Sequence, residues 1–189
     1  MQPSSEDDTQ LIAKVRRGDR EAYRFLVEAH QDRVYRVCLH TLSDRTQAED
    51  LAQDTFTRAY QKLDQFDAAK GTFLVWILTI ARRISINALK KRTPLTLNHV
   101  PETISASKDR PDAHASRSDT LAALDDALRK LSDDHRRAFV LAEIEELSHG
   151  EIARIEGITV GTVKSRISRA KQMLQGRIQP IYEEINDLT

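Results

Sequence analysis

A predicted helix near the C-terminal end of the chain carries the side chains best suited to contacting DNA. Residues 159–178 contain five basic side chains and no acidic one. Arg and Lys can donate hydrogen bonds to guanine O6 and N7, Gln can pair with adenine, and Ser can bond a phosphate or let the helix lie close to the bases. A basic face is also common on helices that bind nothing. The candidate duplex-binding residues are Thr162, Lys164, Ser165, Ser168, Arg169, Lys171 and Gln172.

The residues before this helix predict the turn that positions it. Ser148 and Glu151 have the spacing of a capping box that begins a short helix. Gly157 suits the left-handed conformation that ends such a helix, and Thr159 can cap the next one. At about 100° per residue, the second helix collects its apolar side chains on one face, and the pattern predicts a helix-turn-helix. The face expected to be buried is Val160, Val163, Ile167, Ala170 and Leu174.

A second group of polar side chains lies at the start of an earlier predicted helix. Thr46 and Glu49 have capping-box spacing, so they are expected to open this helix. Its first turns carry an acidic, polar face that suits a basic partner surface. Acidic residues in a first turn can also compensate the helix dipole without any partner. The face comprises Glu49, Asp50, Gln53 and Asp54.

Aromatic and basic residues follow between Phe66 and Arg92, and together they suit a single strand of nucleic acid. Such a strand needs stacking surfaces and a cationic path. The aromatic candidates are Phe66, Phe73 and Trp76, and the basic candidates are Lys70, Arg82, Arg83, Lys90, Lys91 and Arg92. The helical spacing of Phe73 and Trp76 is more often typical of core packing, which is the alternative for these rings.

The elements that must position these groups are helices. Apolar residues recur at helical spacing through most of the chain, and alternating strand patterns are scarce. The sequence therefore predicts an all-α fold of two small helical domains. Residues 8–92 form the first domain and residues 119–178 the second, joined by a flexible linker at 93–118 that is rich in Ser, Thr, Asp and Pro. An acidic tail follows at 179–189.

The formal net charge of zero conceals a segregation of charge along the chain. The net charge is −2 over residues 1–70, +5 over 71–118, −5 over 119–158 and +2 over 159–189. A neutral chain can still bind a polyanion through locally basic stretches. We therefore expect DNA binding by the chain alone to be weak.

Other functional classes find little support in the sequence. Cys38 is the single cysteine, so an internal disulfide and a cysteine-based zinc site are excluded, and its apolar surroundings predict a core residue. No run of 18 apolar residues and no export signal is present, which favours a cytoplasmic protein without membrane insertion. The chain lacks a phosphate-binding glycine loop, a His-Glu-x-x-His helix and a Gly-x-Ser-x-Gly elbow. We predict no enzyme, no cofactor and no metal site.

Two stretches of the chain resemble a known family. Residues 148–173, SHGEIARIEGITVGTVKSRISRAKQM, resemble region 4 of the extracytoplasmic-function (ECF) group of sigma-70 factors. Region 2 of the same group is similar to residues 49–92, which contain EDLAQDTFTRAYQKLDQF and TFLVWILTIARRISINALKKR. The resemblance extends over both domains in the family's order and spacing.

This resemblance implies a promoter-specificity subunit of bacterial RNA polymerase. Core polymerase, through its β′ and β subunits, and promoter DNA are the implied partners, together with an anti-sigma factor. The loop at 66–72 would hold a flipped base of the −10 element, and the second domain would bind the −35 element. Arg83 stands where the family often has Asn, so the base preference is open. The implied polymerase-docking residues are Glu49, Asp50, Gln53, Asp54 and Phe56.

The residues alone leave other interpretations open. A helix-turn-helix regulator could bind an operator as a dimer without polymerase, and a homodimer on a palindromic site would favour that class. Polymerase-dependent binding to an asymmetric site would favour the sigma interpretation. An enzyme of unrecognised type would need an activity retained without DNA or polymerase.

Overall fold

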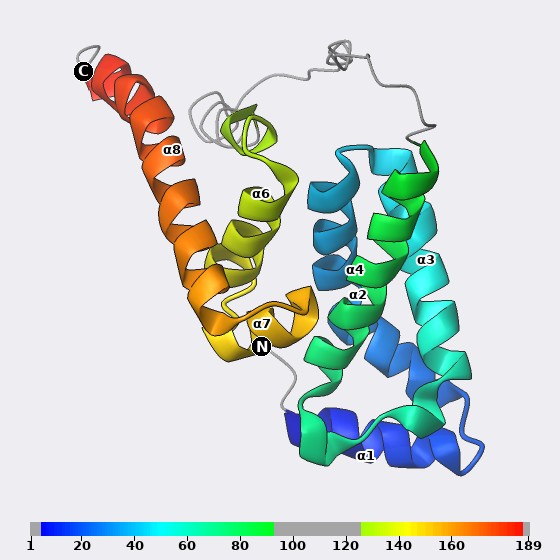
Figure 1. Cartoon of the computed structure of the whole chain (residues 1–189). Helices are drawn as coiled ribbons and strands as arrows, with labels where there is room; N and C mark the ends of the chain where they lie inside the picture. Colours follow the sequence, from blue (N-terminus) through cyan, green and yellow to red (C-terminus); the bar gives the residue numbers. More distant parts are fainter. Residues whose placement is uncertain (1–4, 93–125, 187–189) are drawn as a thin grey trace.

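The computed structural model describes residues 5–92 and 126–186, and within these ranges every regular element is a helix (Figure 1). The predicted all-α fold is confirmed. The expected linker at 93–118, the first residues of the second domain and the last residues of the tail lie outside the described residues.

The first domain is a bundle of three long helices with a shorter one across its end (Figure 1). The long helices pack on one another, and α1 contacts α2 most closely. Two short 3₁₀ turns connect the third helix to the fourth. The elements are α1 (Ser5–Arg16), α2 (Glu21–Leu42), α3 (Arg45–Gln61), η1 (Leu63–Gln65), η2 (Ala68–Lys70) and α4 (Phe73–Arg92).

The second domain consists of shorter helices followed by one long helix. Its described elements are α6 (Asp133–Phe139), the π-helical turn η3 (Val140–Ile144), α7 (His149–Glu156) and α8 (Val160–Asn186). Helix α8 continues to Asn186, so the predicted boundary between second domain and acidic tail at 178/179 falls inside a helix. The end of α8 extends away from the rest of the molecule (Figure 1).

Helix α3 begins earlier than expected. The N-cap is Asp44, whose carboxylate accepts from the Gln47 amide at 3.1 Å. The capping box predicted for Thr46 and Glu49 is therefore wrong, because Thr46 already lies inside the first turn. Asp is as good an N-cap as Ser or Thr, and an extended Asp44 satisfies an otherwise free amide at this helix end.

The structure confirms the capping interactions that the sequence predicts for the helix-turn-helix. Ser148 and Glu151 form the complete capping box at the start of α7, and Gly157 ends α7 with φ 62°. Thr159 accepts from the Thr162 amide at 3.2 Å and so caps α8. Each of these groups satisfies a backbone amide or adopts a backbone conformation that a helix terminus requires.

The predicted buried face of α8 is correct except at its first residue. Val163, Ile167, Ala170 and Leu174 are all buried, whereas Val160 is 42% exposed. Val160 has the correct angle on the helix wheel but begins the helix, beyond the packing partners that cover the following turns.

The two domains share one hydrophobic core. Buried residues of α2 and α4, such as Leu26 and Leu78, belong to the same cluster as Leu141, Ile152 and Val163 of the second domain. Helix α4 packs on α7, and α2 packs on α6. Each fully buried Leu or Ile side chain contributes about 1.5–3 kcal/mol, so contacts across this boundary contribute to folding stability. The second domain therefore lies against the first (Figure 1).

Candidate nucleic-acid interface

The outward face of α8 presents the predicted duplex-binding side chains to solvent. Lys164, Ser165, Ser168, Arg169 and Gln172 are all exposed. They lie opposite the buried stripe, so the packing that anchors α8 leaves this face free to enter a groove.

Two further candidates on α8 already have partners within the protein. Thr162 is half-buried and takes part in the cap with Thr159. The Lys171 ammonium lies 2.9 Å from a Glu143 carboxylate oxygen. These two are therefore less available for DNA than the five exposed residues.

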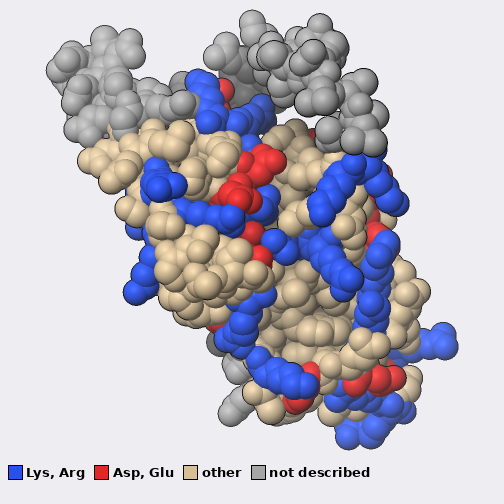
Figure 2. Space-filling view, viewed as in Figure 1, with Lys and Arg blue, Asp and Glu red and all other residues tan. Residues whose placement is uncertain are grey.

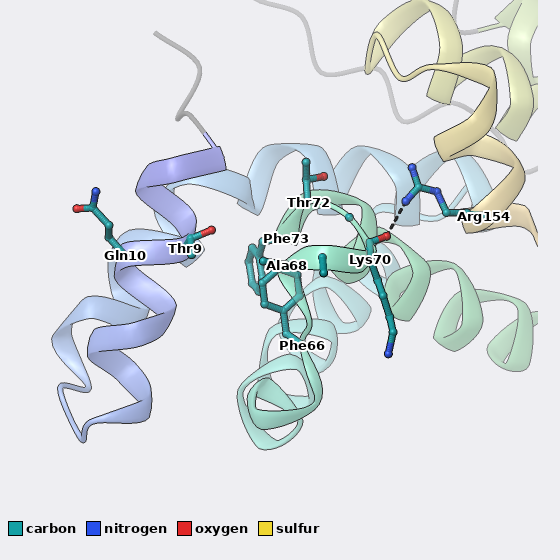
Figure 3. Close-up of a pocket in the computed structure, with 10 residues that line it drawn as sticks. Thr9, Gln10, Phe66, Ala68, Lys70, Thr72, Phe73 and Arg154 are labelled. Atoms are coloured by element: carbon teal, nitrogen blue, oxygen red, sulfur yellow. Dashed lines mark hydrogen bonds between the residues drawn. The ribbon is translucent and has the colours of Figure 1, made fainter.

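The loop between α3 and α4 encloses a pocket (Figure 3). The cavity measures about 570 Å³ and is lined from the loop by Phe66, Lys70 and Thr72, and from α1 by Thr9 and Gln10. A second cavity of about 260 Å³ lies beside it, and Trp76 lines that one. Pockets of this size, next to aromatic rings, suit an unstacked base.

The aromatic residues at this loop form one cluster, in which only Trp76 keeps appreciable exposure. Phe66 contacts Phe73 edge-on at 5.8 Å between ring centroids and Trp76 at 5.6 Å. Phe73 is 1% exposed and Phe66 7%, whereas Trp76 is half-buried. The structure thus places most of Phe73 in the core beneath the loop, although Phe73 still forms part of the wall of the first cavity. Phe66 remains at the wall of both cavities.

Two side chains hold this loop in shape. Arg16 of α1 donates to the carbonyl oxygens of Leu63 at 2.7 Å and Phe66 at 2.6 Å. Asp67 accepts from the Ala69 amide at 3.0 Å, and this hydrogen bond, with help from Lys70, holds the pKa of the Asp67 carboxyl below its usual value. The sequence analysis did not identify Arg16, because its acceptors lie about 50 residues away along the chain.

The predicted phosphate-binding residues of α4 divide into two groups. Arg83, Lys90 and Lys91 are exposed. Arg82 is half-buried, with its Nε 3.2 Å from a carboxylate oxygen of Glu156 in α7. The side chain of Arg92 lies outside the described residues.

The predicted acidic face of α3 is exposed and borders an apolar groove. Glu49, Asp50 and Gln53 are open to solvent, whereas Asp54 lies 2.9 Å from Arg58. Phe56 is 7% exposed and contributes to the wall of a groove of about 500 Å³ between α2 and α3. The remaining lining residues are Val27, Gln31, Asp32, Tyr35, Glu49, Ala52 and Gln53.

A buried carboxylate joins the two domains. Glu145 is fully buried, and its two carboxylate oxygens accept from Arg33 Nε and Arg36 Nε of α2 at 2.7 Å each. Its backbone carbonyl accepts from Arg33 as well. Arg136 of α6 donates to the carbonyl of His40 at 2.6 Å.

A further contact between the domains reaches the loop pocket. Arg154 of α7 donates from Nη1 to the backbone carbonyl of Lys70 at 2.7 Å (Figure 3). The guanidinium also lies where a side chain at Gly71 would stand, since a Cβ there would be 2.8 Å from Arg154 Nη1. Sequence reasoning missed all these contacts between the domains. The i, i+3 spacing of Arg33 and Arg36 is a local hint of one of them.

These features are those of a two-domain helical DNA-binding protein. One domain carries an exposed basic helix-turn-helix, and the other carries an aromatic-walled pocket beside basic residues. The described residues include no helix long and apolar enough to span a membrane.

Comparison with known families agrees with this class and narrows it. The family model for Sigma-70 region 2 matches residues 26–94 of the sequence, and the family model for Sigma-70, region 4 matches residues 121–174. The chain belongs to the sigma-70 family, within its ECF group.

Individual relatives cover both domains. The ECF RNA polymerase sigma factor SigW of Bacillus subtilis is 31% identical over 183 residues, which are 90% of this chain and 96% of SigW. The structure of CnrH in complex with the cytosolic domain of CnrY matches with a TM-score of 0.69 at 26% identity, covering 92% of this chain and 98% of that one. The sigma factor RpoE in complex with the anti-sigma factor NepR, from Bartonella quintana, matches with a TM-score of 0.65 at 25% identity, covering 83% and 96%.

Proposed function

We propose that the chain directs promoter-specific initiation by RNA polymerase through three surfaces made of its own residues. As an ECF sigma factor it takes bacterial core RNA polymerase and promoter DNA as partners. The observation that carries the proposal is the coexistence, in one chain, of an exposed acidic face on α3 and an exposed basic face on α8. The first domain is assigned residues 8–92 and the second residues 119–178.

The first surface is the docking face for core polymerase. Glu49, Asp50 and Gln53 stand exposed beside an apolar groove that includes part of Phe56. An acidic rim beside apolar surface suits a basic helical partner, because the charges orient the partner and the groove buries its apolar side chains. Asp54 supports this face through its ion pair with Arg58.

The second surface is the loop pocket, which we assign to an unpaired base of the −10 element. Phe66 and Trp76 supply the ring surfaces, whereas Phe73 holds the loop from below. Lys70 and the exposed cations Arg83, Lys90 and Lys91 would bind the phosphates of the strand. In this arrangement Arg82 binds Glu156 and reaches a phosphate only when that ion pair opens.

The third surface is the outer face of α8, assigned to a −35 duplex. Arg169 and Lys164 can donate to guanine, Gln172 can pair with adenine, and the exposed Ser side chains can bond phosphates.

A dimeric regulator is not favoured, because the relatives are sigma factors over both domains. We propose that the chain is a polymerase subunit and not an enzyme, and that it acts in the cytoplasm with the polymerase. An anti-sigma protein is the proposed inhibitor.

Transcription in vitro from genomic DNA, with core polymerase in the presence and absence of the chain, tests the proposal. The chain should produce discrete new transcripts. Asp50→Ala should weaken assembly with core polymerase while the free chain stays folded, whereas the matched control Glu28→Ala, an exposed acid on α2, should assemble normally. The absence of new transcripts with the unaltered chain would show that the proposal is wrong.

A duplex-binding measurement tests the assignment of α8 separately. Arg169→Ala should weaken binding of the assembled polymerase to its −35 duplex by about 1–3 kcal/mol if Arg169 pairs with guanine. Lys130→Ala removes an exposed cation elsewhere in the second domain and should leave the affinity unchanged. Equal affinities for the Arg169 variant and the unaltered chain would exclude that role.

A further inference from the structure

A group of exposed cations lies at the end of the first domain, outside the three surfaces assigned above. We call this group the basic end and define it as Lys14, Arg17, Arg20 and Lys62, all of which are exposed. Figure 2 shows Lys and Arg side chains gathered at the lower right of the molecule, over the end of α1 and the start of α2.

Tertiary structure brings these cations together. Gly18, with φ 101°, ends α1 in a tight turn, and Asp19 caps the start of α2 by accepting from the Ala22 amide. Arg16 donates to the Leu63 carbonyl and thereby fixes the end of α3, where Lys62 lies, beside this turn. Three helix termini therefore meet at the basic end.

The acidic residues nearby leave a net positive charge at the basic end. Residues 10–24 and 54–64 together carry seven basic and four acidic side chains. Asp54 pairs with Arg58, and Asp64 lies 3.9 Å from Arg16. Asp19 is used as a helix cap, and Glu21 pairs with Arg24 at 3.6 Å. Within the described residues, none of the four cations of the basic end has an ion-pair partner. Unpaired, solvated cations in one place are suited to phosphates.

An exposed aromatic ring stands among these cations. Tyr60, near the end of α3, is 41% exposed. One side of its ring is held by Tyr23 in an edge-on contact at 4.9 Å, and Tyr23 is itself fixed by donating to the Phe56 carbonyl at 2.6 Å. Arg20 lies one helical turn before Tyr23 along α2. A fixed ring with an exposed surface, at a place where helix termini carry cations, is a combination that suits single-stranded nucleic acid.

The basic end is continuous with the loop pocket along α1. Gln10 lies at the rim of that pocket, and Lys14 follows at i+4 on the same side of α1, with Arg17 in the turn just beyond the end of the helix. At 1.5 Å per residue, Lys14 lies about 6 Å along the helix from Gln10. A strand with one base in the pocket therefore needs only a few nucleotides to reach the basic end.

We propose that the basic end is a second contact site for single-stranded DNA, in which Lys14, Arg17, Arg20 and Lys62 bind backbone phosphates and Tyr60 stacks on a base. That the strand is promoter DNA rests on the proposed function. The site is independent of base sequence, because neither cations on phosphates nor ring stacking distinguishes the four bases strongly. It prefers a single strand to a duplex, since a base in a duplex cannot stack on Tyr60.

Salt-dependent binding of DNA to the full chain tests the cations. The probe is a fluorescently labelled single strand of about 12 nucleotides of mixed sequence, followed by anisotropy over a range of salt concentrations. Removing each phosphate contact lowers the slope of log K against log salt by about 0.7, so the triple variant Arg17→Gln, Arg20→Gln, Lys62→Gln should lose about 2. The matched control Lys130→Gln should keep the original slope, and exchanging Arg17 and Arg20 for Lys should keep it too.

Tyr60 variants test the stacking. Tyr60→Leu should weaken single-strand binding about five-fold or more, whereas Tyr60→Phe, which retains the ring, should bind like the unaltered chain. Neither substitution should change binding of the same sequence as a duplex. Circular dichroism verifies that each variant is folded.

Three outcomes would overturn the inference: no single-strand binding at low salt, an unchanged slope in the triple variant, or equal losses for single strand and duplex in Tyr60→Leu. None of these results affects transcription directed by the unaltered chain, so failure of this site remains distinguishable from failure of the proposed function.

Discussion

Replacing Glu145 with Gln should lower the free energy of unfolding by about 3 kcal/mol. The carboxylate is fully buried and accepts from two arginines of the other domain at 2.7 Å each. Hydrogen bonds to charged groups contribute about 1.5–3 kcal/mol each, which sets an upper limit near 6 kcal/mol for the two. The Arg33 side chain is 20% exposed and the Arg36 side chain 38%, so water solvates both guanidinium groups when the charge is removed. This solvation, and the one acceptor that Gln retains, reduce the expected loss to about 3 kcal/mol.

Urea unfolding followed by circular dichroism measures this loss. The matched control is Glu146→Gln, which removes the same charge from the neighbouring, exposed residue and should change stability by no more than about 0.5 kcal/mol. Equal stabilities of the two variants would refute the argument, because they would mean that burial and the arginine partners of Glu145 contribute nothing.

A double-mutant cycle then assigns the loss to the contact between the domains. Arg33→Gln and Glu145→Gln should be non-additive, with a coupling of about 1 kcal/mol or more, because each substitution removes the same interaction. Strict additivity would show that Glu145 stabilises the second domain alone.

Further predictions concern local features. Asp44→Ala should destabilise the protein by about 1 kcal/mol through loss of the α3 cap, whereas Thr46→Ala should be nearly neutral in urea unfolding; the reverse order would restore the capping box expected from the sequence. Gly157→Ala should cost about 1 kcal/mol in the same assay through its positive φ alone, since no atom lies within 4 Å of the added Cβ, and an unchanged midpoint would contradict this. Because burial raises the pKa of the Cys38 thiol to about 11, iodoacetamide at about pH 8 should alkylate Cys38 only after unfolding, as mass spectrometry would show. Equal labelling of folded and unfolded protein would contradict the buried position.

The parts of the fold that depend on short stretches of sequence could be predicted. The helix-turn-helix follows from Ser148, Gly157 and Thr159, because each acts within three or four residues of itself. The buried stripe of α8 follows from helical periodicity, and the prediction failed at Val160, the first residue of the helix, which is 42% exposed. The cap of α3 was misplaced because two good capping residues, Asp44 and Thr46, stand close together and only the backbone conformation decides between them.

Contacts between distant residues could not be predicted. Glu145 lies more than 100 residues from Arg33 and Arg36, and nothing in its own surroundings marks it as buried. Phe73 and Trp76 have the same sequence signal, yet Phe73 is almost completely buried and Trp76 only half-buried. The exposed positions of Asp50, Lys164 and Arg169 agree with the pattern of the sequence, whereas the candidates Phe56 and Phe73 are buried. The roles of all these residues stay predictions.

The hydrogen bond from Arg154 to the Lys70 carbonyl couples two equilibria. Any group that enters the loop pocket from the side of Arg154 must displace that guanidinium, and so it binds more tightly to molecules in which the domains have already separated. Binding equilibria are reciprocal. If separation of the two domains raises the affinity of the pocket for the ligand by some factor, the bound ligand raises the equilibrium constant for domain separation by the same factor. The apparent dissociation constant at the pocket is then the intrinsic value divided by the fraction of separated molecules. A substitution at Glu145, which does not itself line the pocket, is therefore expected to tighten binding there.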